Sequence, residues 1–181
     1  MIPPGKERTP MERNRGFTLV ELLVVVALIA ILASIIIPVA GRSKAGILKK
    51  RAMMECQSIR LAAIQFNSEH LYMPWPPENR NGHPVYVGDD KVTDASTQPN
   101  VIRMLCGDNA LRKVYLEVPD IARDPSDENR FLDPWGKPYV ILLDRNKDGS
   151  IKAGGDIGTI SDSVAVYTTD PKHPDKRIQT W

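Results

Sequence analysis

An apolar run near the start of the chain constrains its fold more than any other feature. Residues 17–40 read FTLVELLVVVALIAILASIIIPVA, and Glu21 is their one ionisable side chain. An α-helix of this length, rising about 1.5 Å per residue, can cross a hydrocarbon layer of about 30 Å. We therefore predict a membrane-spanning helix over residues 17–40.

The segment before this run, residues 1–16, has four basic and two acidic side chains and three prolines. A segment so short and so rich in proline is not expected to fold alone. Basic residues before a membrane span favour an N-terminus that stays in the cytoplasm. The rest of the chain would then lie across the membrane.

Three interpretations of this N-terminal region compete. A secretory signal peptide is disfavoured, because its apolar part usually has about 7–15 residues and because Pro38-Val39-Ala40 is a poor cleavage site. A plain signal anchor is the second interpretation. The third is a leader that is processed at Gly16, and the residues around Gly16 favour it.

Residues 15–22, RGFTLVEL, resemble the processing site of type IV pilins and of type II secretion pseudopilins. The resemblance implies that a prepilin peptidase cuts after Gly16 and methylates the new amine of Phe17. It also implies that residues 17–40 become the core helix of a filament.

Glu21 needs an explanation of its own. A carboxylate costs roughly 2.5–3.5 kcal/mol near the centre of a membrane helix and less near its end. We expect no partner for Glu21 within its own helix. The resemblance implies that the amine of Phe17 on an incoming subunit neutralises it, so Glu21 is predicted to be an assembly residue and not a catalytic one.

Residues 41–70 predict an amphipathic continuation of the helix. Apolar residues recur there every three or four positions and form one stripe, which consists of Leu48, Ala52, Cys56, Ile59, Ala63 and Phe66. We expect this stripe to pack on the protein's own sheet. Five basic residues within 42–51 either meet anionic lipid head groups or form a solvated face, and both alternatives stay open.

Residues 71–181 predict a small head on the far side of the membrane, and the resemblance implies that this side is the periplasm. Glycine, proline and aspartate separate the expected elements of this head, which are a short strand at 85–87, a helix at 99–105 and strands at 112–118, 137–144 and 162–169. We therefore predict an α+β fold in which the long N-terminal helix packs on a small antiparallel sheet.

The head also carries a resemblance. ALRKVYLEVPD, FLDPWGKPYVILLD and the terminal SVAVYTTDPKHPDKRIQTW are similar to the heads of major pseudopilins, which have the pilin-like fold. Within DPWG, residues 133–136, we interpret Asp133 as the start of a turn, Trp135 as a buried anchor and Gly136 as a residue with positive φ.

The loop DRNKDGSI, residues 144–151, alternates oxygen-bearing side chains as the start of an EF-hand loop does. Gly155 stands where such a loop ends in glutamate, and the next residue could substitute. The candidate calcium ligands are Asp144, Asn146, Asp148, Ser150 and Asp156. A plain hairpin turn rich in Asn and Asp is the alternative.

The resemblance implies a different calcium site, in the loop after the last strand, where relatives carry two adjacent aspartates. Here Lys176 and Arg177 replace that pair, and Asp170 and Asp175 are the remaining acids. We therefore place the calcium prediction at the loop that begins with Asp144.

No catalytic pattern, nucleotide motif or organic cofactor site is predicted, and a net charge of +2 gives no sign of nucleic-acid binding. The three histidines lack metal-ligand spacing. Cys56 and Cys106 are too few for a disulfide framework and are expected either to pair or to stay free.

The resemblance therefore predicts a structural subunit of a type II secretion pseudopilus in the inner membrane, and not an enzyme. Its expected partners are further copies in a filament, other pseudopilins, the prepilin peptidase, the inner-membrane assembly platform and membrane lipid. Two alternatives remain. One is a type IV pilus or competence pilin, and the other is a membrane-anchored calcium-binding module that never polymerises.

Overall fold

The computed structural model describes residues 17–80, 83–86 and 88–181, without the side chains of residues 35–43, 80 and 83. The chain forms two compact units, Met1–Lys44 and Ala45–Trp181. The predicted leader, residues 1–16, lies outside the described residues.

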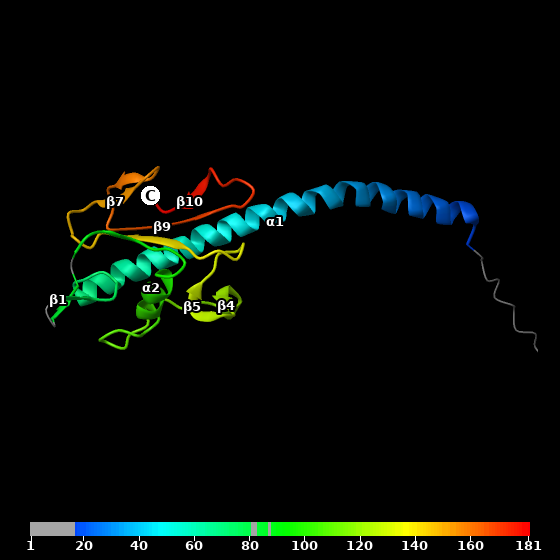
Figure 1. The fold of residues 1–181 in the computed structure, drawn as a ribbon. Coiled ribbons are helices and arrows are strands. Elements are labelled where there is room, and N and C mark those ends of the chain that lie inside the picture. Colours follow the sequence, from blue (N-terminus) through cyan, green and yellow to red (C-terminus); the bar gives the residue numbers. More distant parts are fainter. Residues whose placement is uncertain (1–16, 81–82, 87) are drawn as a thin grey trace, which may run out of the picture. The chain divides into compact units, whose positions relative to one another are not determined.

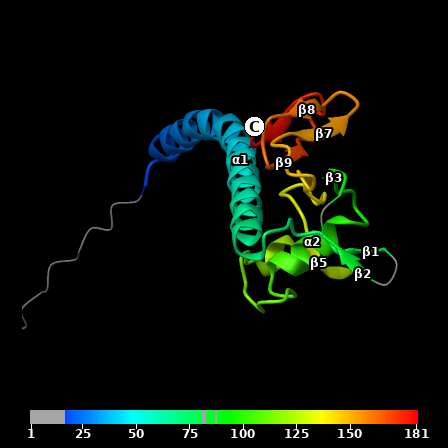
Figure 2. The ribbon, with the colours of Figure 1, turned by 90° about the vertical axis from the view of Figure 1, so that its left-hand side faces the viewer.

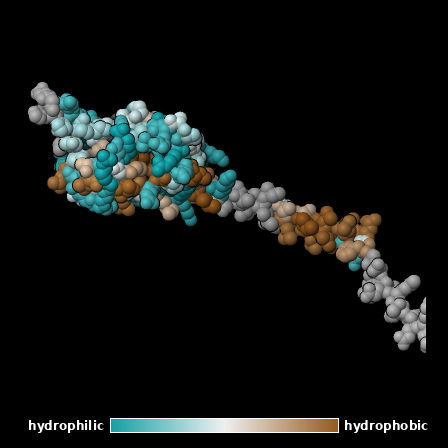
Figure 3. Space-filling view, turned by 90° about the horizontal axis from the view of Figure 1, so that it is seen from below, coloured by the Kyte–Doolittle hydropathy of each residue, from teal (hydrophilic) through white to brown (hydrophobic). Residues whose placement is uncertain are grey.

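Helix α1 is continuous from Leu19 to His70 (Figure 1), which confirms the predicted long N-terminal helix. In the first unit, almost all side chains of residues 17–34 are exposed, and Figure 3 shows the largely apolar surface they make. The side chains of residues 35–40, the end of the predicted span, lie outside the described ones. Among the residues that the structure describes, no helix is both long enough and apolar enough to cross a membrane.

The part of α1 in the second unit buries the predicted stripe. One side of the helix is covered by the rest of the head, and its fully or almost fully buried residues are Ala52, Cys56, Ile59, Ala62, Ala63 and Phe66. Leu48, at the start of the stripe, is only half-buried. The helix ends where Leu71 takes the left-handed conformation at φ 62° and donates its N–H to Asn67 O.

The main sheet is antiparallel and has the strand order β10-β9-β6-β3. Its strands are β3 (Lys91–Val92), β6 (Val140–Leu143), β9 (Val164–Thr169) and β10 (Arg177–Gln179). β6 and β9 are the predicted strands 137–144 and 162–169, both shorter than expected. In Figures 1 and 2, β9 runs beside the second half of α1.

The two central strands alternate between two apolar layers, as a strand with a period of two requires. Ile141 pairs with Val166 in the ladder, and both side chains belong to the core on α1. Leu142 pairs with Ala165, and both belong to a second, smaller core. The hairpin of β7 (Ile151–Gly154) and β8 (Gly158–Ile160) covers that second core, on the side of β9 away from α1 (Figure 2).

A second group of elements lies outside the main sheet, and part of this group contributes to the larger core. It consists of α2 (Gln98–Leu105), the 3-10 helix η1 (Asp120–Ala122), the ladder of β4 (Arg123–Asp124) and β5 (Asp127–Phe131), and the hairpin of β1 (Glu78–Arg80) and β2 (His83–Val85). The fully buried amide of Gln98 joins α2 to β5, because its Nε2 donates to Phe131 O at 2.7 Å and its Oε1 accepts from Phe131 N–H at 3.3 Å.

The turn at residues 133–136 forms as predicted, but its buried residue is the aspartate. Asp133 is 5% exposed, and its Oδ1 accepts the N–H groups of Trp135 at 2.8 Å and Lys137 at 2.9 Å. The hydroxyl of Thr168 on β9 donates to its other oxygen. Gly136 has φ 81°, as expected, whereas Trp135 is only half-buried and is not the predicted anchor.

Two sequence predictions about this unit need correction. Residues 112–118 form no strand, because no strand among the described elements lies alongside them. The N–H groups of Tyr115 and Leu116 instead both donate to Leu105 O, at 2.8 and 3.1 Å. The helix at 99–105 is confirmed as α2. The short strand predicted at 85–87 ends at Val85, and residue 87 lies outside the description.

The cysteines are both free. Cys56 is fully buried in the larger core, and burial raises the pKa of its thiol to about 12. Cys106 is partly buried, and burial raises the pKa of that thiol as well. Of the two alternatives left open by the sequence, the structure has the unpaired one.

The packing of α1 on the sheet predicts a large difference between two neighbouring positions. Ile59→Ala removes a fully buried side chain and should lower the free energy of unfolding by about 2–5 kcal/mol. Leu61→Ala, on the exposed side of the same helix, should change it by less than about 0.5 kcal/mol. Urea unfolding of the detergent-solubilised chain, followed by tryptophan fluorescence, measures both values, and equal losses would contradict this packing.

Candidate functional site

The candidate assembly site lies at the first turn of α1. Thr18 donates its N–H and its hydroxyl to Glu21 Oε2 at 2.9 and 2.7 Å, and Glu21 donates its N–H to Thr18 Oγ1 at 3.2 Å. This reciprocal pair is a capping box, which satisfies N–H groups that have no partner at a helix start. A carboxylate in the first turn is also favoured by the helix dipole.

The expectation that Glu21 has no partner in its own helix is therefore wrong. The Thr-x-x-Glu spacing of Thr18 and Glu21 is the sequence signal for a capping box. The partner of Glu21 is thus the N–H and hydroxyl of Thr18, and not a side chain of opposite charge. All the hydrogen bonds that the described residues give to this carboxylate end on Oε2. Oε1 can therefore accept a hydrogen bond from a second donor without any change to the cap.

The predicted processing site is only partly within the structure. Gly16 lies outside the described residues, and Phe17 is the first described residue, with 77% of its surface exposed. Cleavage after Gly16 and methylation of Phe17 stay predictions. The new amine would lie one residue before Thr18, next to the cap.

The loop predicted to bind calcium is closed by its own hydrogen bonds. Asp144, at 2% exposure, accepts the N–H of Lys147 at 2.6 Å on one oxygen and the N–H of Gly149 at 3.0 Å on the other. Asn146 Oδ1 accepts the N–H of Asp148 at 2.8 Å. These are the bonds of an Asx-rich turn, and they orient the oxygens of the loop.

The last three predicted calcium ligands, Asp148, Ser150 and Asp156, are engaged in other contacts. Asp148 Oδ1 accepts the N–H and the hydroxyl of Ser150, at 2.9 and 2.8 Å. Asp156, between β7 and β8, forms an ion pair with Arg177 of β10. Within the described part of the chain, no three His, Cys, Asp or Glu side chains are arranged to hold a metal ion. Calcium binding by this loop stays a prediction.

The same loop contains a buried arginine that the sequence pattern does not reveal. The side chain of Arg145 is fully buried, and its Nη1 lies 2.9 Å from Glu78 Oε1 on β1. Its guanidinium carbon is 6.0 Å from the centre of the Trp75 ring. The hydrogen bond from Arg145, followed by that from Lys91, lowers the pKa of Glu78 to about 2. Arg145 thus holds β1 to the end of β6.

One acid of the terminal loop, Asp170, has a structural role. Asp170 directly follows β9, and its side chain is 7% exposed. It accepts from Lys49 Nζ of α1 at 3.1 Å, from the N–H of Lys172 at 2.9 Å and from His173 Nδ1 at 3.1 Å. Asp170 therefore joins the end of the chain to α1.

Comparison with known proteins agrees with the N-terminal pattern and extends it over the head. Residues 11–37 match the family model described as the prokaryotic N-terminal methylation motif. The chain is 27% identical over 156 residues to type II secretion system core protein G of Escherichia coli (strain K12), an alignment that covers 83% of this chain and 90% of that protein. No solved structure matches the chain.

The contacts of Asp170 predict a dependence of stability on pH. The N–H of Lys172, then His173 and Lys49, lower the pKa of Asp170 from its ordinary 3.8 to about 2. Because the pKa is lower in the folded state, this carboxylate stabilises the fold above about pH 4, and the contribution is lost as the pH falls toward 2.

Thermal unfolding midpoints between pH 5 and pH 2 measure this effect. The midpoint of the unchanged protein should fall across this window, and that of Asp170→Asn should fall less, because one titrating group is gone. Asp175→Asn, in the same loop but exposed, is the matched control and should follow the unchanged protein. Parallel curves for Asp170→Asn and the unchanged protein would refute the role of Asp170.

Proposed function

Because the chain carries the prokaryotic N-terminal methylation motif and is similar over most of its length to type II secretion system core protein G, it is a pseudopilin of that kind, and we propose how it is processed and assembled. A prepilin peptidase cuts after Gly16 and methylates Phe17. The processed subunit then joins a type II secretion pseudopilus through α1 and supports protein export.

The observation that carries this proposal is the coincidence of the matched motif with the capping box. The motif covers residues 11–37, and within it Glu21 is held at the helix start by Thr18. An incoming subunit would bring the amine of its Phe17 to the free oxygen of Glu21. A carboxylate and an amine that pair in an apolar surrounding interact more strongly than they do in water.

The exposed apolar surface of the first unit supports the proposed packing. Residues 17–34 have almost no buried side chain within the described chain, although most of them are apolar. In water such a surface costs about 25 cal/mol for each Å². We expect membrane lipid to cover it before assembly and other pseudopilin helices to cover it in the filament.

We further propose where the subunit is located and which partners it has. The subunit is anchored in the inner membrane, with its N-terminus in the cytoplasm and its head in the periplasm. Further copies, other pseudopilins and the inner-membrane assembly platform are its partners. The similarity to core protein G extends over the head, and this favours the type II secretion pseudopilus over a type IV pilus and over a calcium-binding module that never polymerises.

The intact mass of the protein, purified from the membranes of its host, tests the processing step. We expect the loss of residues 1–16 and the addition of one methyl group. Gly16→Ala should leave the full-length mass, because the peptidase would no longer find the glycine at its cut. A full-length mass for the unchanged protein would instead support a plain signal anchor.

Two substitutions at the capping box separate the charge of Glu21 from its role in the cap. Glu21→Ala removes both and should abolish incorporation into filaments while membrane insertion continues. Thr18→Val removes the capping hydroxyl, at a cost of about 1 kcal/mol, but keeps the carboxylate. We expect it to be incorporated.

Sedimentation of sheared filaments, with the membrane fraction as the insertion control, measures both variants. Normal incorporation of Glu21→Ala would overturn the assembly role of Glu21. Equal loss in Thr18→Val would mean that the cap is what filaments require.

A further inference from the structure

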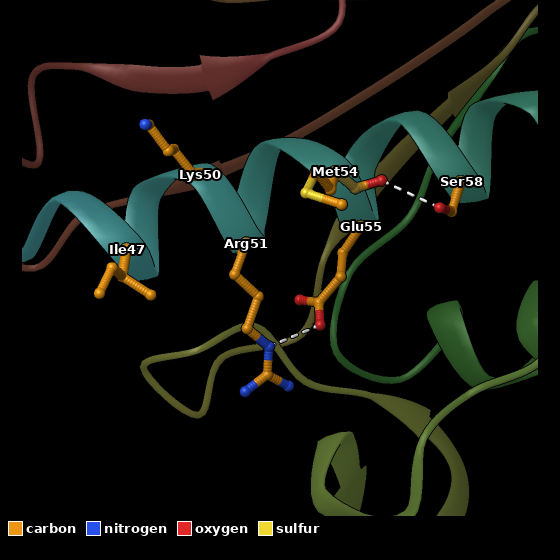
Figure 4. A pocket seen from close by; sticks show the side chains of 6 residues that line it. All are labelled: Ile47, Lys50, Arg51, Met54, Glu55 and Ser58. Carbon is orange, nitrogen blue, oxygen red and sulfur yellow. Dashed lines mark hydrogen bonds and ion pairs between the residues drawn. The ribbon is translucent and has the colours of Figure 1, made fainter. Parts of the chain in front are cut away.

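The head has an open groove along the outer side of α1. It has a volume of about 390 Å³ and is lined by Ile47, Lys50, Arg51, Met54, Glu55 and Ser58. Ile47 and Met54 are 62% and 71% exposed, so that the apolar part of the groove is uncovered in the single chain. Figure 4 shows Lys50 and Arg51 leaving the helix on opposite sides, with Met54 further along the helix beside Glu55.

One edge of this groove is held in place. Arg51 Nε donates to Glu55 Oε1 at 2.8 Å, and the side chain of Glu55 is 14% exposed. Tyr139, a core residue, donates its hydroxyl to the other oxygen of Glu55. The guanidinium of Arg51 is therefore fixed against the head. On the other side of the helix, the ammonium of Lys50 has no partner among the described residues, which leaves its charge for an incoming acid.

A second surface of the same chain has an exposed apolar side chain that is flanked by acidic residues. Ile121, in η1, is 83% exposed and is the most exposed large apolar side chain among the described residues. A tight turn presents it: Ala122 beneath it is 2% exposed and donates its N–H to Pro119 O at 2.9 Å. The side chain of Asp120 beside it is fully exposed and forms a long surface ion pair with Arg123, at 3.6 Å between Oδ1 and Nε, which an incoming cation can share. Glu117, three residues earlier, is exposed as well.

We propose that Ile121 of one copy of this chain inserts into the groove between Ile47 and Met54 of the next copy, with Asp120 facing Lys50. The inference deepens the proposed function and rests on it, since it names the head contact between successive subunits. The apolar side chain fits the uncovered apolar lining, and the acidic flank meets the basic edges. Complementary charges of this kind set the register and suppress wrong partners.

The geometry of this contact suits a filament. The groove and the Ile121 turn are different surfaces, so the contact is heterologous: each copy offers its turn to one neighbour and its groove to another. Such contacts repeat without closing unless the rotation between copies happens to form a ring. A contact between two identical surfaces would stop at a dimer.

Reciprocal charge changes in the full-length chain, expressed with its secretion system, test the contact. Lys50→Glu and Asp120→Lys should each reduce sedimentable filaments at least about tenfold, because each places like charges opposite one another. The double variant restores the opposite charges and should recover most of the filaments. Lys152→Glu, on β7 at the other face of the sheet, is the control and should assemble normally, because its ion pair with Asp148 is local to that loop.

Single variants without effect, or a double variant as poor as the single ones, would overturn the inference. The unchanged protein separates this outcome from a failure of the proposed function. If it sediments as filaments while the swap fails, only the head contact is wrong. If it forms no filaments at all, the pseudopilus proposal fails, and the head contact fails with it.

Cysteine cross-linking gives an independent test of the direction of the contact. A chain with both Met54→Cys and Ile121→Cys should form a ladder of oligomers on oxidation, whereas co-expressed single variants should stop at dimers. Cys56 and Cys106 are present in every sample, and the unchanged chain measures their background. Dimers of Met54→Cys alone would indicate two-fold packing of grooves and overturn the proposal. The groove would instead be assigned to lipid if no cross-link formed and if Lys50→Glu bound anionic vesicles more weakly than the unchanged chain. That result would also overturn the proposal.

Discussion

The packing of one side of α1 against one face of the antiparallel sheet supports the rest of the head. Ile59 and Phe66 of the helix and Ile141 and Val166 of the sheet are fully buried in one core. A four-stranded sheet with an uncovered apolar face would not be stable alone, and the helix stripe needs the same cover. Helix and head therefore fold as one unit from Ala45 onward.

Charged side chains fix how the helix lies on this core. Arg60 binds Asp162 at 2.8 Å and also donates Nε to Val164 O at 3.1 Å, where β9 begins. Lys49 reaches Asp170 just after β9 ends, at 3.1 Å. Apolar contacts are not directional, so these two tethers at the two ends of one strand define the register of α1 along the sheet.

Sequence periodicity predicted the parts of the fold whose pattern depends on a buried face: α1, α2, β6 and β9. It failed at residues 112–118, because periodicity records burial and not hydrogen-bond partners. Leu116 and Val118 are buried there, but no strand of the described part of the chain lies alongside. Arg145 was missed because its partners, Glu78 and Trp75, are distant in the chain. At the candidate assembly site, the acid was found but its bond to Thr18 was not, although local spacing signals it.

The capping box has a consequence for the time before assembly. A subunit whose carboxylate had no hydrogen-bond donor would be unstable in an apolar surrounding for as long as it waited for a neighbour. Thr18 already supplies donors to Glu21. In the proposed assembly, a single subunit would therefore not wait with an unbonded carboxylate, and a reserve of unassembled copies would build up. Growth could then draw on that reserve at once, without waiting for new synthesis.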